Sequence, residues 1–173
     1  MWSSDECHFQ QNGTRCKMWI PNDIKNPVVK QEPTRKKVSV FGSVNVSDGR
    51  LVYSLQQIFN AKTFLDHLNQ ILEYKPPRKK ILLILDNARY HHAKILLPWL
   101  ESNKRSIELL FLPPYSPELN PIEHVWKRER YIGTHNRFFP TITALKECVT
   151  DVFDRWAEPN IELRSLCAIN YVV

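Results

Sequence analysis

The most constraining feature of the sequence is a run of five aliphatic residues, Ile81 to Leu85, that ends abruptly at Asp86 and Asn87. A short apolar run bounded by turn-forming residues predicts a strand buried on both faces of a sheet. In open α/β sheets, ligands bind beyond the carboxyl ends of the parallel strands. The sequence therefore predicts an α/β fold with Asp86 at the edge of the sheet where chemistry takes place.

A second apolar run extends from Ile107 to Leu112 and leads into a proline-rich loop, residues 113–117. A helix is expected to begin next, because Asn120 is a favourable N-cap residue, Pro121 suits the first helical position and Glu123 falls in the first turn. Two strands, a stiff loop and two carboxylates thus form one unit. This unit indicates half of a metal-dependent nuclease site.

The remaining segments predict the other elements of such a sheet. An antiparallel trio of strands followed by helix, strand, helix, strand and helix is the ribonuclease-H-like order, and it predicts a mixed sheet flanked by helices. The expected early strands are Met1 to Gln10, Thr14 to Ile20, Val38 to Val46 and Leu51 to Leu55, with turns at Asn12-Gly13 and Asp48-Gly49 and a loop over residues 21–37. The expected helices are Asn60 to Tyr74, His91 to Asn103 with a kink or restart at Pro98, Asn120 to about Tyr131, Thr141 to Trp156, and a short one after Pro159 that ends in a frayed strand or coil.

Length and composition limit the class of protein. The 173 residues suit one domain with a substantial core, and the net charge of +6 is compatible with an anionic partner. The four cysteines lack the paired spacing of a zinc site and indicate reduced thiols in an intracellular protein. The sequence has no membrane-spanning apolar segment, no signal-peptide core, and no glycine-rich loop that would predict a nucleotide cofactor.

Several acidic residues are candidates for a metal site. Two-metal phosphoryl transfer needs carboxylates around ions about 3.5–4 Å apart, and Mg²⁺ prefers such oxygen ligands. Asp86 and Glu123 are two candidates, and Asp5 on the first strand is the third. Glu6 should point to the opposite face of that strand. Asp48 lies in an Asp-Gly turn and is better explained structurally.

Each candidate carboxylate also has a structural interpretation. Asp86 with Asn87 could turn the chain and cap the next helix. Glu123 could complete a capping box with Asn120 and favour the helix dipole. Asp5 could be a solvated residue near the terminus. Spacing alone gives these interpretations the same weight as the catalytic one.

Longer motifs break this tie. The segments LLILDNARYHHAK (residues 82–94) and LLFLPPYSPELNPIEHVWKRER (residues 109–130) closely resemble the catalytic domain of mariner-like insertion-sequence transposases, of the DDE superfamily. Residues 4–9 resemble the family's first-aspartate strand, and VSVFGSVN, residues 38–45, resembles its third strand. The resemblance covers nearly the whole chain and implies a ribonuclease-H-like fold.

The resemblance also implies residue roles. Asp5, Asp86 and Glu123 are expected to be the catalytic and metal-binding residues, with Asn87 and His91 orienting Asp86. The family cuts DNA at transposon ends and joins the freed 3′-hydroxyl to target DNA, using Mg²⁺ or Mn²⁺, and two ions are expected. A homodimer is expected because DDE enzymes generally act as dimers or larger assemblies.

Basic residues follow Glu123 on the same expected helix. Lys127, Arg128 and Arg130 suit a DNA phosphate backbone beside a metal site, although a solvated helix surface would have the same composition. These three residues are therefore the expected DNA contacts.

The N-terminus departs from the family. Full transposases carry helix-turn-helix domains that bind the transposon ends, and only four residues precede Asp5 here. Residues 1–173 are therefore expected to form a single catalytic domain without a helix-turn-helix domain and with a clipped first strand. One alternative is a catalytically inactive fragment that retains non-specific DNA binding or dimerisation. The other is a purely structural domain.

Overall fold

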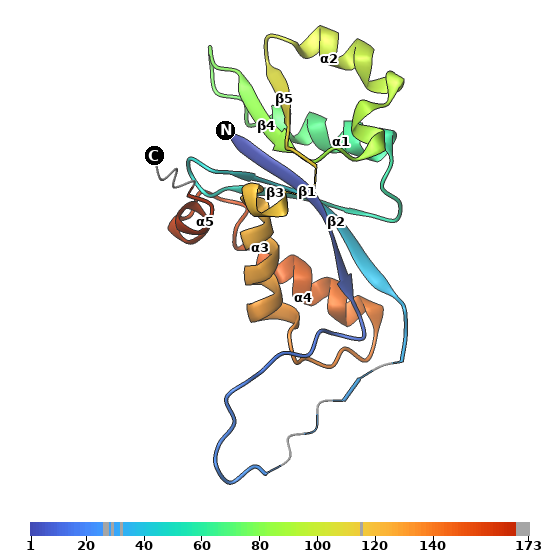
Figure 1. The fold of residues 1–173 in the computed structure, drawn as a ribbon, viewed down its shortest axis with the longest axis vertical. Helices are drawn as coiled ribbons and strands as arrows, with labels where there is room; N and C mark the ends of the chain where they lie inside the picture. Colours follow the sequence, from blue (N-terminus) through green and yellow to red (C-terminus); the bar gives the residue numbers. More distant parts are fainter. Residues whose placement is uncertain (26–27, 29, 32, 115, 169–173) are drawn as a thin grey trace.

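One mixed sheet forms the centre of the molecule (Figure 1). The computed structural model describes residues 1–173 apart from residues 26–27, 29, 32, 115 and 169–173. Within the described chain, the sheet has five strands in the order β3–β2–β1–β4–β5. They are β1 (Trp2–Gln10), β2 (Lys37–Asn45), β3 (Leu51–Gln56), β4 (Ile81–Leu85) and β5 (Ile107–Phe111). β1, β2 and β3 pair antiparallel, whereas β4 and β5 run parallel to β1, so the predicted mixed sheet is confirmed.

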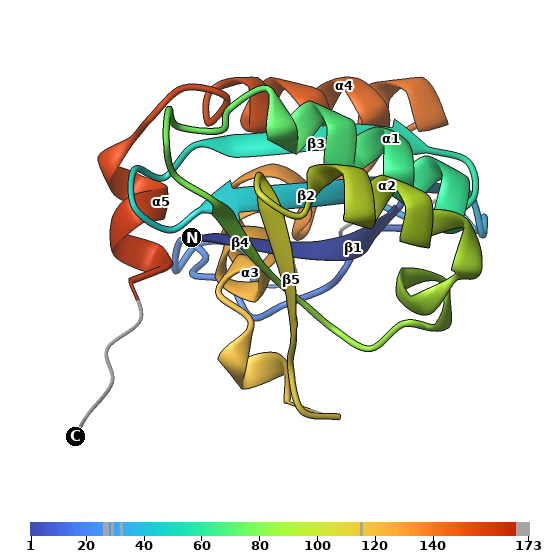
Figure 2. The ribbon, with the colours of Figure 1, turned by 90° about the horizontal axis from the view of Figure 1, so that it is seen from above.

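Helices cover both faces of the sheet (Figure 2). The α-helices are α1 (Ala61–Leu72), α2 (Leu97–Asn103), α3 (Ile122–Glu129), α4 (Ile142–Asp154) and α5 (Ile161–Leu166). α1 and the residues around α2 share one hydrophobic core with the sheet, and α3, α4 and α5 share a second core with the opposite face. Among the described residues, no helix is long and apolar enough to cross a membrane. All four cysteines are free thiols.

The side chains of β1 alternate between these two cores. Trp2 belongs to the core with α1, whereas Cys7 and Phe9 belong to the core with α3 and α4. β1 pairs with β2 along its whole length but with β4 only at Trp2 and Ser3. The remainder of β1 therefore lies beyond the paired region, next to the carboxyl end of β4.

The predicted hairpin after β1 is only partly present. The Gly13 amide donates to the Gln10 carbonyl at 3.0 Å, and Gly13 has a φ of +67°, so the turn forms. The returning strand expected over residues 14–20 is wrong, because these residues have no regular secondary structure and β2 is the partner of β1. Burial explains the choice, since Trp19 is fully exposed while Val40 is fully buried.

The helix predicted over residues 91–103 is divided. Two 3-10 turns, η1 (Arg89–His92) and η2 (Lys94–Leu96), precede α2. Pro98 lies in the first turn of α2, where its missing N–H costs no helical hydrogen bond. The restart expected at Pro98 is therefore confirmed.

Helix ends also differ in part from the prediction. Asn60 caps α1 as expected, by accepting from the Lys62 and Thr63 amides. The N-cap residue of α3 is Pro121, and no side chain caps this helix, so the predicted Asn120 cap is wrong. The strand or coil expected at the C-terminus falls on residues 169–173, outside the described residues.

Candidate active site

The three predicted carboxylates line one cavity of about 390 Å³. Asp5 comes from the middle of β1, Asp86 directly follows β4, and Glu123 lies in the first turn of α3. Further lining residues come from the loops that follow β4 and β5: Asn87, Ala88, Leu112, Pro113, Pro114, Ser116, Pro117 and Asn120. Three separate elements thus bring three acidic side chains to one concave surface.

The environment of Asp5 disfavours its negative charge. The Trp126 indole N–H donates to Asp5 Oδ2 at 3.1 Å, which is the favourable contact. Burial raises the pKa of Asp5 to about 7, with further contributions from repulsion by Glu6 and Glu123.

Gly42 of β2 allows the contact between Trp126 and Asp5. A Cβ atom at position 42 would lie 2.2 Å from Trp126 Cη2, so no larger residue fits while the ring stays there. The ring consequently packs against β2, with its N–H directed at Asp5. A glycine inside a strand often marks this kind of close approach.

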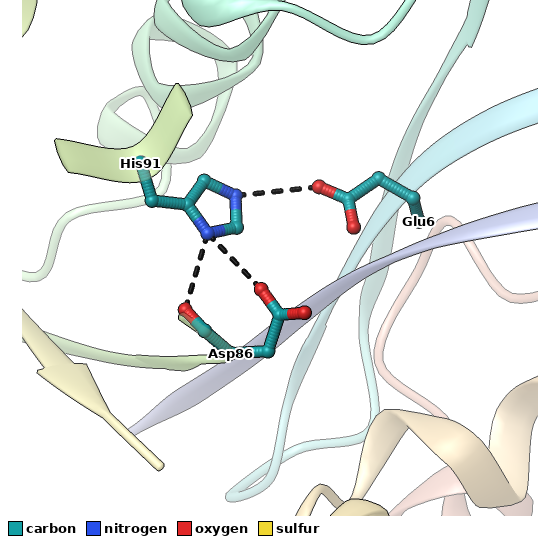
Figure 3. A group of neighbouring side chains, drawn as sticks. All are labelled: Glu6, Asp86 and His91. Carbon is teal, nitrogen blue, oxygen red and sulfur yellow. Dashed lines mark hydrogen bonds and ion pairs between the residues drawn. The ribbon is translucent and has the colours of Figure 1, made fainter. Parts of the chain in front are cut away.

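Asp86 is anchored through one of its two carboxylate oxygens (Figure 3). Asp86 Oδ1 accepts from the Ala88 amide at 2.9 Å and lies 3.2 Å from His91 Nδ1. The same His91 nitrogen lies 3.2 Å from the main-chain carbonyl oxygen of Asp86. Because a carbonyl oxygen only accepts, Nδ1 carries a proton. The side chain of Asp86 is half exposed and faces the cavity.

His91 connects Asp86 to Glu6 on the other face of β1 (Figure 3). His91 is buried, and its Nε2 lies 3.3 Å from Glu6 Oε1. This contact is within ion-pair distance but is not aligned as a hydrogen bond. Glu6, His91 and Asp86 offer ligand atoms within 4.8 Å of one another, a spacing that could hold a metal ion. The two imidazole nitrogens face different carboxylates, however, so the arrangement is a carboxylate–imidazole–carboxylate chain.

The sequence prediction placed Glu6 correctly but missed this chain. Asp5 contacts Trp126 of α3, whereas Glu6 contacts His91 of η1, as strand alternation requires. The family resemblance implied that His91 orients Asp86, and a contact between the two residues is present. The link to Glu6 depends on how η1 packs against β1, and no local pattern in the sequence encodes that packing.

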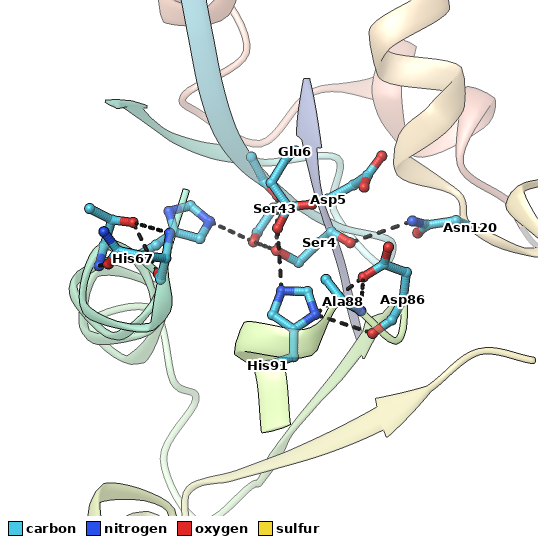
Figure 4. A network of polar contacts seen from close by, with 12 residues as sticks. Ser4, Asp5, Glu6, Ser43, His67, Asp86, Ala88, His91 and Asn120 are labelled. Atoms are coloured by element: carbon cyan, nitrogen blue, oxygen red, sulfur yellow. Dashed lines mark hydrogen bonds and ion pairs between the residues drawn. The ribbon is translucent and has the colours of Figure 1, made fainter. Parts of the chain in front are cut away.

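Asn120 joins the start of α3 to β1 (Figure 4). Its side-chain oxygen accepts from the Ser3 hydroxyl, and its amide nitrogen donates to the Ser4 carbonyl at 3.4 Å. Ser3 Oγ in turn accepts from the Ile122 amide at 3.2 Å. The Asn120 side chain is therefore engaged by β1, and the capping box considered for Glu123 does not form.

A buried polar network continues from Ser4 (Figure 4). Ser43 Oγ donates to Ser4 Oγ and lies 2.9 Å from His67 Nε2. Burial lowers the pKa of His67 to about 4, so this histidine is neutral near pH 7. The network fixes the strand on which Asp5 lies, without reaching the cavity.

The side chain of Asn87 forms hydrogen bonds in the wall of the cavity, and its partners among the described residues are Leu112 and His92. Its amide donates to the Leu112 carbonyl at 2.5 Å, and its oxygen lies 3.2 Å from His92 Nε2. Asn87 thus ties the end of β4 to the residue that follows β5, where the proline-rich loop begins.

The three predicted DNA contacts occupy different environments. Lys127 is exposed. Arg128 Nε pairs with Glu162 Oε1 at 2.5 Å, and its guanidinium carbon lies 5.7 Å from the centre of the Tyr131 ring. Arg130 donates to Cys7 Sγ at 2.9 Å. The role of these three residues in DNA binding therefore stays a prediction.

Comparison with known proteins assigns the family. Residues 1–146 match a family model described as DDE superfamily endonuclease. The chain belongs to this family. An uncharacterised protein of Sinorhizobium fredii is 34% identical over 101 residues, 58% of this chain and 70% of that protein. The Tc3 transposase of Caenorhabditis elegans is 34% identical over 91 residues, 51% of this chain and 26% of that transposase.

Solved structures confirm the fold. A Mos1 mariner paired-end complex with Mn is similar with a TM-score of 0.72 and 20% identity, covering 96% of this chain and 51% of that one. The catalytic domain of Mos1 mariner transposase gives a TM-score of 0.63 at 16% identity, covering 96% of this chain and 74% of that one. The chain spans about half the length of the longer Mos1 chains. The expected ribonuclease-H-like fold and the expected family are thus both confirmed.

Proposed function

We propose that this DDE domain cuts DNA and transfers the cut strand to a second DNA, with Asp5, Asp86 and Glu123 as its catalytic residues. The observation that carries the proposal is that these three carboxylates, from three separate elements, line one cavity. Family membership supports the class of reaction.

The donor set fits Mg²⁺ or Mn²⁺. All three side chains offer hard oxygen ligands, and the repulsion that raises the pKa of Asp5 would be relieved by a bound cation. When bound, two such ions would activate the attacking oxygen and stabilise the leaving oxygen. Solved Mos1 complexes with Mn and with Mg support this choice of metal.

The reaction consists of two phosphoryl transfers. In the first, water attacks a phosphodiester, one P–O bond forms, another breaks, and a 3′-hydroxyl is released. In the second, that hydroxyl attacks a phosphodiester of another DNA strand in the same way. Bonds balance in each step, so no nucleotide cofactor and no covalent protein–DNA intermediate are needed.

His91 and Glu6 would position Asp86 for this role. Asp86 Oδ1 is engaged by the Ala88 amide and by His91, which leaves Oδ2 as the oxygen for a metal ion. Glu6 fixes the far side of the imidazole ring. Such outer partners of a ligand typically contribute 10- to 100-fold in metal affinity or activity.

DNA is the proposed partner, and a homodimer is the proposed assembly. Mos1 structures include a paired-end complex with the left transposon end and a strand transfer complex. Apolar side chains for a contact with a second copy are available between β1 and β2, where Met18 and Trp19 are exposed. Because its proposed substrate is DNA, the protein would act inside the cell.

Calorimetric titration of Mn²⁺ into the purified protein tests the proposal, with Asp86→Asn as the variant. The matched control is Asp48→Asn, because Asp48 lies in the β2–β3 turn and accepts from the Arg50 amide, which asparagine can also do. Binding that is lost in Asp86→Asn and kept in Asp48→Asn supports the site. A folded wild-type protein that binds no Mn²⁺ would overturn it and favour an inactive DNA-binding fragment.

A further inference from the structure

A second cavity, of about 230 Å³, lies at the other end of β1. Its walls come from three places: the end of β1 at residues 8–10, the turn at residues 13–14, and the π-helical turn η4 (Arg130–Thr134), which directly continues α3. Gly13 and Thr14 are held against η4 and the residues after it, because the Asn136 amide donates to the Thr14 carbonyl at 3.0 Å. The cavity is thus built by segments that are distant in the sequence.

Arg130 is the charged residue of this cavity. It is partly buried, donates to Cys7 Sγ at 2.9 Å, and has its guanidinium carbon 5.5 Å from the centre of the Phe9 ring. None of the ion pairs found among the described residues includes Arg130. An unpaired charge is costly for a partly buried cation.

The neighbouring acid, Glu129, is in none of these ion pairs, and its Oε2 accepts from the Thr134 hydroxyl at 3.4 Å. Glu129 is fully buried, and burial raises its pKa to about 8, although Arg130, Thr134 and Arg137 lower it in part. Its carboxyl lies against Gly133, where a Cβ atom would be 2.5 Å from Glu129 Oε1.

The position of this cavity relates it to the carboxylates. Asp5, Cys7 and Phe9 are every second residue of β1, and their side chains face α3. The three residues of strand from Asp5 to His8 span about 10 Å. Glu123 to Arg130 corresponds to about 10 Å of helix. Both elements therefore lead from the first cavity to the second, over about three base steps of a duplex.

We propose that the Arg130 cavity binds a backbone phosphate of the DNA strand whose scissile phosphodiester lies at the carboxylate cavity. A guanidinium is suited to this role, because its fork of N–H donors matches two phosphate oxygens. The proposal rests on the proposed DNA-cutting function and adds the position at which the strand is held.

The test is the salt dependence of binding to a short DNA duplex. Each phosphate contact contributes about 0.9 to the slope of log K against log salt. Arg130→Gln is expected to lower the slope by about that amount and to weaken binding several-fold. Arg50→Gln removes the same charge from a residue that is paired with Glu158 and lines neither cavity, so it should leave the slope unchanged. Equal slopes in Arg130→Gln and wild type, or equal losses in both arginine variants, would overturn the proposal.

A second variant avoids disturbing Arg130 itself. Thr14 lines the cavity from an exposed position in the turn after β1, and Thr14→Glu adds a negative charge to that wall. This variant should weaken DNA binding as Arg130→Gln does, while Mn²⁺ binding stays at the wild-type level. Unchanged DNA binding in Thr14→Glu would contradict the subsite.

Inorganic phosphate separates failure of the subsite from failure of the proposed function. If the wild-type protein binds no DNA, the function fails, and the NMR signal of the Arg130 Nε–H group is then followed during a phosphate titration. A shift of that signal, absent for Arg50, supports an anion site that takes free phosphate. No shift overturns the site as well.

Discussion

Asp5 and Glu6 are neighbours on β1, yet they leave the strand on opposite faces and meet different partners. Asp5 accepts from Trp126 and opens onto the cavity that Asp86 and Glu123 also line. Glu6 lies against buried His91, which contacts Asp86 from behind. The comparison teaches that strand alternation gives two adjacent acids different environments. In the proposed site, Asp5 would bind a metal ion, and Glu6 would help to position Asp86 through His91.

The largest effect is expected from substitution of Asp5, whose side chain opens onto the carboxylate cavity. Asp5→Asn should lower metal-dependent DNA cleavage more than about a thousandfold, because a lost metal ligand removes several kcal/mol of transition-state stabilisation. Cleavage of a labelled duplex measures this. Activity within tenfold of wild type would contradict the proposed difference between Asp5 and Glu6, because Asp5 would then be a structural residue.

Substitution on the opposite face should have an intermediate effect. Glu6→Leu should lower cleavage roughly 10- to 100-fold, because His91 loses its outer partner and holds Asp86 less firmly. Glu6→Gln should recover most of the activity, since an amide can still contact the imidazole. Equal losses in both variants, measured as Mn²⁺ affinity and cleavage rate, would show that Glu6 acts through its charge alone.

A smaller effect is expected where α3 joins β1. Asn120→Ala removes the contacts to Ser3 and Ser4 and leaves the buried Ser3 hydroxyl without that acceptor, at a cost of about 1–3 kcal/mol in unfolding free energy. Cleavage should fall about tenfold because Glu123 is less well placed. Urea unfolding and cleavage rates measure the two effects. Lost stability with unchanged cleavage would limit Asn120 to folding.

Glu129 is a buried acidic residue outside the candidate site. Its substitution should change the stability of the protein and leave DNA cleavage unchanged. Burial raises its pKa to about 8, so the folded state holds the proton more tightly than the unfolded state. The unfolding free energy should therefore be full below about pH 4.5 and fall as the pH rises to about 8, by on the order of a few kcal/mol. Glu129→Gln should lose this part of the pH dependence in denaturant titrations. An unchanged pH profile would contradict a buried, protonated Glu129.

The sequence predicted those parts of the molecule that depend on local patterns. The apolar run before Asp86, the cap at Asn60 and the proline in the first turn of α2 are each encoded within a few residues, and all appear in the fold. Alternation along β1 also separated Asp5 from Glu6. The longer motifs indicated the family, and the family resemblance grouped Asp5, Asp86 and Glu123 as one predicted site.

The remaining features depend on contacts between distant residues. Residues 14–20 follow a good turn, but β2 buries its side chains better and takes the place beside β1. Asparagine is a common N-cap residue, yet the side chain of Asn120 accepts a hydrogen bond from Ser3, 117 positions away. Arg128 and Arg130 look alike in sequence, and only the packed structure pairs one of them with Glu162.

The most direct test of the shared site is nicking of supercoiled plasmid DNA in the presence of Mn²⁺, by the wild-type protein and by Glu123→Gln. Glu123 comes from a different element than Asp5 and Asp86, so its contribution shows whether the three carboxylates act together. The account predicts Mn²⁺-dependent nicking by the wild type and its loss in a folded Glu123→Gln variant. Nicking that persists in Glu123→Gln, or that does not require a divalent ion, would contradict a single site built from Asp5, Asp86 and Glu123.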